Sequence, residues 1–347
     1  MTTQSLPKHA HHASPTHEPP AALRATGIVV MLAAVIAIIA IAFALPAARS
    51  KPQNVPIGAA GPQAAGSGLG SPPGGRGVAD ILEHNAPGAF EITYYPGEAA
   101  LRDAIHNRDV YGGISFGPDG RTLLIATGGS PTVAQLLSQV GNDIAQHSGV
   151  QLRTEDLAPP TADDPRGAGL AASALTITLA GLLPAIALML VLRREVWTRF
   201  AAAVVFAGLA GWTIAALLRY VLGSIDANFW GVAGGLTLGA LASGLSMLGL
   251  GSLFGRVGLG IGSLLALLLG NPLSGLTSAP QLLPSGWGAL GQWLPQGANA
   301  TLLRSTAFFG GAGSTMAIVV LTCWTVAGAV LIFIAAVRNG KGVRLPS

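Results

Sequence analysis

Residues 168–192, AGLAASALTITLAGLLPAIALMLVL, decide the class of this protein, because they contain no charged side chain. A transmembrane helix needs about 20 mostly apolar residues, so this stretch is long enough to cross a bilayer. The rest of the chain follows the same trend. Half of its 347 residues are hydrophobic and only 10% are charged, against about 25% in ordinary soluble domains. We therefore predict an α-helical polytopic membrane protein that has the lipid bilayer as a partner.

Five further stretches are similarly apolar, and together with the first they predict six spans. These stretches are residues 27–46, 200–222, 229–254, 257–273 and 315–337. The stretch at 257–273 is short, which fits a tilted or partial span. The stretch at 27–46 fits either an uncleaved anchor or a secretory signal peptide. We favour the anchor, because its apolar run exceeds the roughly 7–15 residues of a signal peptide core.

The distribution of basic residues predicts the orientation of these spans. With the N-terminus inside, the inner segments 1–26, 193–199, 255–256 and 338–347 hold nine Lys and Arg against two acidic residues. The outer segment 47–167 holds eight basic and twelve acidic residues. An excess of Lys and Arg marks the cytoplasmic side. We therefore expect a multi-pass protein with both termini in the cytoplasm, and no nucleic-acid partner behind the net charge of +4. The 16 Arg against 3 Lys suggest a GC-rich genome, and on that bias we expect the plasma membrane of a bacterium.

A small folded domain is predicted outside the membrane, between the first and second spans. Residues 47–77 are rich in Pro, Gly and Ser, which predicts a flexible external linker. Residues 78–167 then alternate strand and helix patterns, which predicts an extracytoplasmic α+β domain. The expected strands are 90–95, 110–116, 122–127 and 150–157, and the expected helices are 98–108 and 131–147. The polar residues of this domain are explained as solvated helix faces. The tails 1–26 and 338–347 are expected in the cytoplasm, the first one disordered.

Chemistry-bearing motifs are scarce in this sequence. The three lysines, Lys8, Lys51 and Lys341, do not lie in the P-loop spacing that binds nucleotide phosphates. The single cysteine, Cys323, excludes an internal disulfide and a thiolate metal cluster. We expect no catalytic residue, no cofactor and no metal site, and therefore no enzyme. If the protein uses ATP, a separate subunit has to bind it.

Glycines recur at helical spacing in the stretches 229–254 and 257–273. They are Gly231, Gly235, Gly239, Gly251, Gly255, Gly258 and Gly262. Glycines four residues apart form a flat stripe on which another helix can pack closely. The stripe fits close packing within the five-span bundle of residues 168–337, or the seam of a homodimer, and the spacing does not separate these two interpretations.

The segment 271–313 is too apolar for an ordinary loop and too rich in proline for a span. Its marked residues are Pro272, Pro284, Trp287, Trp293, Pro295 and Arg304. Tryptophan is enriched where a membrane meets water. Irregular backbone at membrane depth is tolerated only where protein buries it or where it lines water. We expect an external interfacial or re-entrant segment that acts as a translocation gate, or, as the alternative, a simple interfacial plug.

Several short motifs give the chain a resemblance to a known family. They are LAPP at 157–160, DDPRG at 163–167, Asn271-Pro272, LPSGW at 283–287, GQWLPQG at 291–297, Leu303-Arg304-Ser305 and Phe308-Phe309. With the layout of one span, a large external domain and five spans, they resemble the type-2 permease class of ABC exporters. The likeness covers about residues 25–337 and is strongest to the phage-infection-protein-like (YhgE/Pip-like) branch.

This resemblance implies a permease subunit that moves a hydrophobic or amphipathic substrate outward, as a dimer with cytoplasmic ATPases. The ATPase would dock on the short loop RREVWTR through Arg193, Arg194 and Arg199. The alternative function is a non-transporting membrane scaffold or receptor, of the secretion-accessory or phage-infection-protein kind, that acts through its external domain.

Overall fold

The computed structural model describes residues 20–61, 82, 86–117, 120–148, 151–192, 195–276 and 278–341. The chain divides into two compact units, residues 1–42 and 43–347. Helix α1 (Ala21–Ala48) begins in the first unit and holds the apolar stretch Ala25–Ile41. Most of the tail predicted at 1–26 and the end of the tail at 338–347 lie outside the described residues, as does much of the linker at 47–77.

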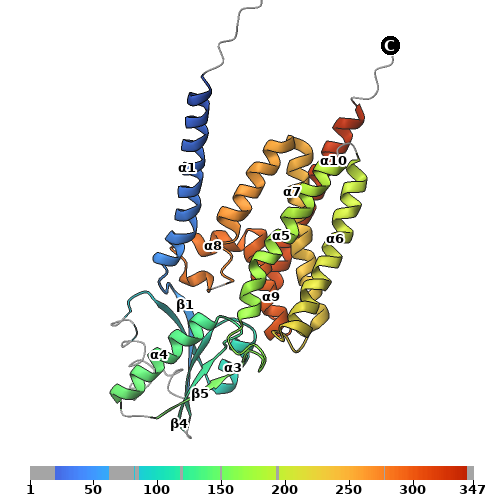
Figure 1. The fold of residues 1–347 in the computed structure, drawn as a ribbon. Coiled ribbons are helices and arrows are strands. Elements are labelled where there is room, and N and C mark those ends of the chain that lie inside the picture. Colours follow the sequence, from blue (N-terminus) through green and yellow to red (C-terminus); the bar gives the residue numbers. More distant parts are fainter. Residues whose placement is uncertain are drawn as a thin grey trace, which may run out of the picture. The chain divides into compact units, whose positions relative to one another are not determined.

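Among the described residues, four helices are long and apolar enough to cross a membrane. They are α5 (Ala168–Val191), α6 (Val196–Ala216), α7 (Phe229–Leu265) and α10 (Thr315–Lys341). Two of them continue into π-helical turns, α6 at Leu217–Val221 and α7 at Ala266–Gly270. Helices α5, α6 and α10 pack against α7 (Figure 1). These helices support a helical membrane protein, whereas the number of six spans and the side of the termini stay predictions.

Helix α7 turns back on itself at Gly255, where φ is 65° and ψ is −143°. A Cβ on Gly258 would lie 2.3 Å from the carbonyl oxygen of Leu250, and one on Gly262 would lie 2.8 Å from the Sδ of Met247. Such pairs cannot meet along a straight helix, which rises about 1.5 Å per residue. The two arms of α7 therefore lie side by side and antiparallel (Figure 1). The stretches 229–254 and 257–273 fall on these two arms.

A five-stranded sheet with the order β2-β1-β3-β4-β5 precedes α5 in the chain. Its strands are β1 (Val55–Ala60), β2 (Phe90–Tyr95), β3 (Gly112–Gly117), β4 (Gly120–Ile125) and β5 (Leu152–Asp156). The pair β3–β4 is antiparallel, and the other neighbours are parallel. Helix α3 (Glu98–His106) lies between β2 and β3, and α4 (Pro131–Ser148) lies between β4 and β5. The elements predicted between residues 90 and 157 are thus present in the predicted order.

The prediction of a flexible linker over all of 47–77 is wrong for residues 55–60. These residues form β1, which pairs with β2 on one side and with β3 on the other. The sequence VPIGAA carries only a weak strand signal, because it lacks a sustained alternation of apolar and polar residues and a run of β-branched residues. Small residues are needed there: a Cβ on Gly113 of β3 would lie 2.2 Å from the carbonyl oxygen of Gly58.

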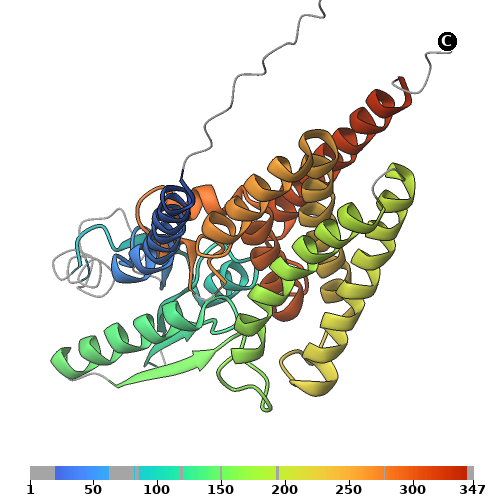
Figure 2. The same cartoon turned by 45° about the horizontal axis from the view of Figure 1, so that its top comes forward.

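Each face of the sheet has its own apolar core, as the period of two in a strand requires. Helices α3 and α4 lie on opposite faces of the sheet (Figures 1 and 2). Leu123 and Ile125 of β4 face α4, whereas Leu124 between them faces α3. The core under α4 also takes in Ala279 and Leu282, and the core under α3 takes in Phe308. The segment 271–313 therefore belongs to the hydrophobic core of the sheet as well as to the bundle.

Three helical pieces make up most of this segment. They are a 3-10 turn at Pro280–Leu282, α8 (Trp287–Gln292) and α9 (Pro295–Phe308). Glycines let their backbones touch. A Cβ on Gly288 would lie 2.0 Å from the carbonyl oxygen of Pro280, and one on Gly291 would lie 2.0 Å from that of Leu273. Helix α9 is almost entirely buried and packs against α5, α7 and α10.

Candidate functional site

A polar pocket of about 540 Å³ lies between the sheet and the segment 271–313. One wall comes from the start of β1 and from the turn between α3 and β3. The other wall comes from residues 280–292 and from α9. The walls are also tied by backbone: the N–H groups of Lys51 and Gln53 donate to the carbonyl oxygens of Leu282 and Gln281, at 3.1 and 3.0 Å. The pocket is therefore built by elements far apart in the sequence.

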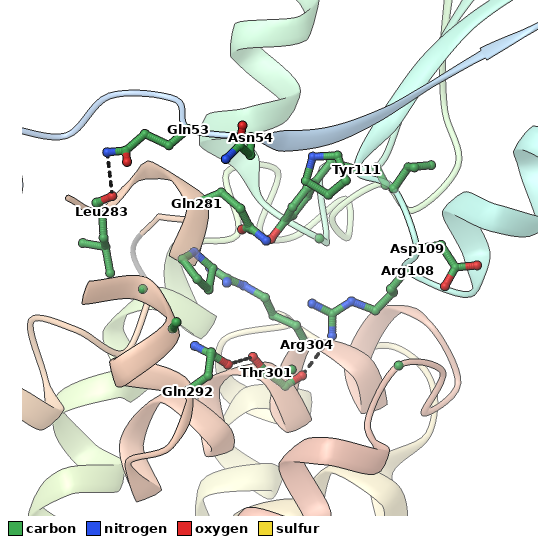
Figure 3. Close-up of a pocket in the computed structure, with 18 of the residues that line it drawn as sticks. Gln53, Asn54, Arg108, Asp109, Tyr111, Gln281, Leu283, Gln292, Thr301 and Arg304 are labelled. Atoms are coloured by element: carbon green, nitrogen blue, oxygen red, sulfur yellow. Dashed lines mark hydrogen bonds between the residues drawn. The ribbon is translucent and has the colours of Figure 1, made fainter. Parts of the chain in front are cut away.

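Arg304 on α9 is 5% exposed and extends along the floor of the pocket (Figure 3). Its guanidinium donates to the carbonyl oxygens of Gly275, Leu276 and Ser278, at 2.8 Å for Gly275 and 3.2 Å for Ser278. Burial lowers the pKa of Arg304 to about 10, with Tyr111 opposing this shift and the charge of Arg108 adding to it. The group stays protonated at neutral pH and fixes the irregular backbone at 275–278.

Arg108 enters the same pocket from the sheet side (Figure 3). Its Nη1 donates to the carbonyl oxygen of Thr301 at 3.1 Å and to the hydroxyl of Ser305, both on α9. Its guanidinium carbon lies 5.3 Å from the ring centre of Phe309. Burial lowers the pKa of Arg108, and Tyr111 opposes this shift. Its φ of 66° is rare for a residue other than glycine, so the contact with α9 is held by an unusual backbone conformation.

Tyr111 and Gln281 close the other side of the pocket (Figure 3). The Tyr111 hydroxyl donates to Gln281 Oε1 at 2.9 Å. Burial raises the pKa of Tyr111, although both arginines and Gln281 act in the opposite direction. The phenol is therefore neutral at pH 7 and does not balance the arginine charges.

Carboxylates are scarce around these two arginines. No ion pair joins Arg108 or Arg304 to an acidic side chain within the part of the chain that the structure describes. Asp109 lines the pocket but is exposed, and its carboxylate points away from the guanidinium of Arg108 (Figure 3). The pocket thus holds two positive charges, a half-buried one on Arg108 and a buried one on Arg304. Within the described residues they contact carbonyl and hydroxyl oxygens and an aromatic ring.

The residues marked in 271–313 do not gather at one point. Pro284 and Arg304 line the pocket. Trp287 begins α8, and Pro295 occupies the first turn of α9, where a missing N–H is tolerated. Trp293 is 62% exposed, and its carbonyl oxygen accepts from Trp324 Nε1 at 2.8 Å. Pro272 is half-buried. Whether this segment is a gate or a plug stays a prediction.

The docking loop expected for an ATPase is only partly visible. Arg193 and Arg194 lie outside the described residues. Arg199 lies in the first turn of α6 and is 2% exposed, with its Nη1 against the sulfur of Met189. Its side chain is therefore not presented at the surface, which differs from the prediction that it contributes to a dock.

The predicted glycines serve contacts within this chain. Added Cβ atoms on Gly235 and Gly239 would meet Leu302 and Asn299 of α9. Gly251, Gly258 and Gly262 lie between the two arms of α7, Gly255 forms their turn, and Gly231 lies against its own cap residue Asn228. These positions fit the first interpretation, packing inside the bundle. The homodimer stays a prediction.

One hydrolase-like spacing was missed in the sequence. Residues 113–117, GISFG, match the pattern G-x-S-x-G of hydrolase nucleophiles. That chemistry needs the serine on a sharp turn between a strand and a helix. Ser115 instead lies inside β3, paired with Thr122, and is 1% exposed. The spacing therefore carries no catalytic prediction.

Comparison with known proteins gives no match to a family model, to a curated protein or to a solved structure. Among the described residues, no group of three or more His, Cys, Asp or Glu side chains is placed to hold a metal.

Proposed function

We propose that this chain is the membrane permease subunit of an export system, in which a separate ATPase supplies the energy. The substrate would be hydrophobic or amphipathic and would move outward. The observation that carries the proposal is the position of α9. This helix is enclosed by α5, α7 and α10 and is also hydrogen-bonded, through Arg108, to the turn between α3 and β3 of the sheet domain. It connects the sheet domain, which the predicted topology places outside the membrane, with the bundle.

The polar residues of α9 support a moving part at this place. Asn299 is 1% exposed and lies against Gly239 of α7, and neither of its side-chain polar atoms has a hydrogen-bond partner among the described residues. An unsatisfied buried amide costs about 1–3 kcal/mol, which a packing that pairs this amide would recover. A second packing of α9 against α7 that satisfies Asn299 would change the bundle and the pocket together.

A second candidate function is a receptor or scaffold that acts through the sheet domain. Two observations favour it. Arg199 is buried, so this one of the three arginines expected to dock an ATPase is not presented at the surface. The pocket, in contrast, lies between the sheet and the segment 271–313, where an external partner would reach it under the predicted topology.

Co-purification separates the two functions. The chain is tagged at its C-terminus, extracted from native membranes in mild detergent, and its partners are identified by mass spectrometry. An unrelated multi-span protein with the same tag is the matched control. A stoichiometric ATPase with a P-loop, absent from the control, is expected for the permease. Recovery of external or secretion-apparatus proteins without an ATPase would contradict the permease and favour the receptor.

A further inference from the structure

We propose that the pocket between the sheet and α9 binds a phosphate group, which Arg108 and Arg304 hold from two sides. The pocket would bind this group whether or not the chain transports a substrate. The inference rests on the donors that the protein leaves unused, on the balance of charge, and on the size of the space.

Arg108 and Arg304 do not use all of their N–H donors within the described part of the protein. A guanidinium carries five N–H donors. Arg304 uses three of them on the carbonyl oxygens of Gly275, Leu276 and Ser278. Arg108 uses two, both from Nη1, on Thr301 and Ser305. The remaining donors have no partner among the residues that the structure describes, and both side chains line the pocket.

The balance of charge points to an anion. Two like charges in one partly buried space repel each other, and each has lost hydration. Within the described part of the chain no carboxylate compensates them. A bound anion between the two guanidinium groups would relieve both costs. The fold therefore keeps a charge pattern that is unfavourable for an empty pocket and favourable for an occupied one.

The geometry favours phosphate over carboxylate. A carboxylate has two oxygens and is filled by one bidentate arginine. A phosphate offers three or more acceptor oxygens and can take arginines from two directions. The volume of about 540 Å³ also leaves room for an attached alcohol or sugar. Amide side chains such as Gln53 and Gln292 line that room and can bond hydroxyl groups.

Phosphate can come from a soluble compound or from the headgroup of an anionic lipid, and two probes separate these sources. The purified full chain is heated in phosphate-free buffer while its tryptophan fluorescence is followed. One series contains inorganic phosphate, and the other contains short-chain phosphatidylglycerol. Sodium chloride at equal ionic strength and short-chain phosphatidylcholine are the controls. A ligand that binds the native state raises the unfolding temperature in a saturable way.

We expect at least one probe to stabilise the chain beyond its control, and the stronger probe identifies the source. Arg108→Gln should raise the half-saturating concentration about tenfold or more, because a charge-assisted hydrogen bond is lost. Arg153→Gln removes an exposed charge of β5 outside the pocket and should leave the concentration unchanged.

A second pair of variants keeps both arginines. Ala289 is exposed at the rim of the pocket on α8. Ala289→Glu adds a negative charge there and should raise the half-saturating concentration about three- to tenfold by repulsion. Ala289→Gln has the same size without the charge and should behave like the unmodified chain. The proposal is overturned if neither probe stabilises the unmodified chain, or if Ala289→Glu and Arg108→Gln both respond as their controls do.

Discussion

Asp164 is the residue whose replacement gives the sharpest test of how the sheet domain meets the bundle. Its Oδ1 accepts the N–H of Ala168 and its Oδ2 accepts the N–H of Gly169, both at 2.8 Å. Oδ2 also accepts the hydroxyl of Ser224 at 2.7 Å, from the connection between α6 and α7. One carboxylate thus caps the N-terminus of α5 and links it to a neighbouring loop.

The loss in free energy of unfolding that we expect for Asp164→Ala follows from these hydrogen bonds. Loss of a side-chain cap costs about 1 kcal/mol. Ser224 is 2% exposed, and a hydroxyl left there without its acceptor costs about 1–2 kcal/mol more. Because these bonds share one group, they do not simply add. We expect Asp164→Ala to lower the free energy of unfolding by about 2–3 kcal/mol. Asp163→Ala is the matched control, since Asp163 is exposed, and it should change stability by less than about 0.5 kcal/mol.

The pH dependence gives a second readout. Burial raises the pKa of Asp164, but the hydrogen bonds from Ser224, Gly169 and Ala168 outweigh it and leave the pKa below its usual value. A carboxylate with a lowered pKa stabilises the fold above the unfolded pKa of about 3.9 and loses this effect as the pH falls through the folded pKa.

Thermal unfolding of the purified chain, followed by fluorescence between pH 7 and pH 3, measures both effects. Asp164→Asn should be less stable than the unmodified chain at pH 7 and should approach it at low pH. Equal unfolding temperatures for Asp163→Ala and Asp164→Ala, or an unchanged acid dependence in Asp164→Asn, would refute the reasoning.

Three further predictions use the same unfolding assay. Gly291→Ala should cost more than about 2 kcal/mol, because its Cβ would lie 2.0 Å from a carbonyl oxygen, whereas Gly234→Ala, with nothing within 4 Å, should be neutral or stabilising. Asn299→Leu should cost less than about 1 kcal/mol, because it removes an amide that has no hydrogen-bond partner in the described part of the chain. Asn228→Leu should cost more, because that amide donates to a carbonyl oxygen of α9 at 2.8 Å, and the reverse order would contradict the packing described. Gly255→Ala should cost about 1–3 kcal/mol through its φ of 65°, and an unchanged stability would argue against the turn in α7.

Much of the secondary structure could be predicted, because it depends on local patterns. The apolar stretches matched α5, α6 and α10 closely, since hydropathy over some 20 residues is a strong signal. The strand patterns at 90–95, 110–116 and 122–127 located β2, β3 and β4. Strand β1 was not predicted, because the strand conformation of VPIGAA depends on pairing with β2 and β3 rather than on its own residues.

The candidate site could be predicted only in part. Arg304 stood out as the one charge in an apolar segment. Arg108 gave no such signal, because a basic residue just after a helix is ordinarily predicted to be solvated. Only the fold brings its side chain to α9. The role of the glycines in α8 and α9 was also not predicted. These glycines allow close backbone contacts between segments, and their positions follow no regular spacing in the sequence.

Cysteine accessibility in intact cells tests the central claim, a multi-span chain with the sheet domain and its pocket outside. Cys323 is replaced by Ala, and single cysteines are placed at Glu91, Asp226 and Arg256, all exposed positions. We expect a membrane-impermeant maleimide to label positions 91 and 226 in intact cells, and position 256 only after the membrane is opened. Labelling of position 256 from outside, or protection of position 91, would contradict this arrangement.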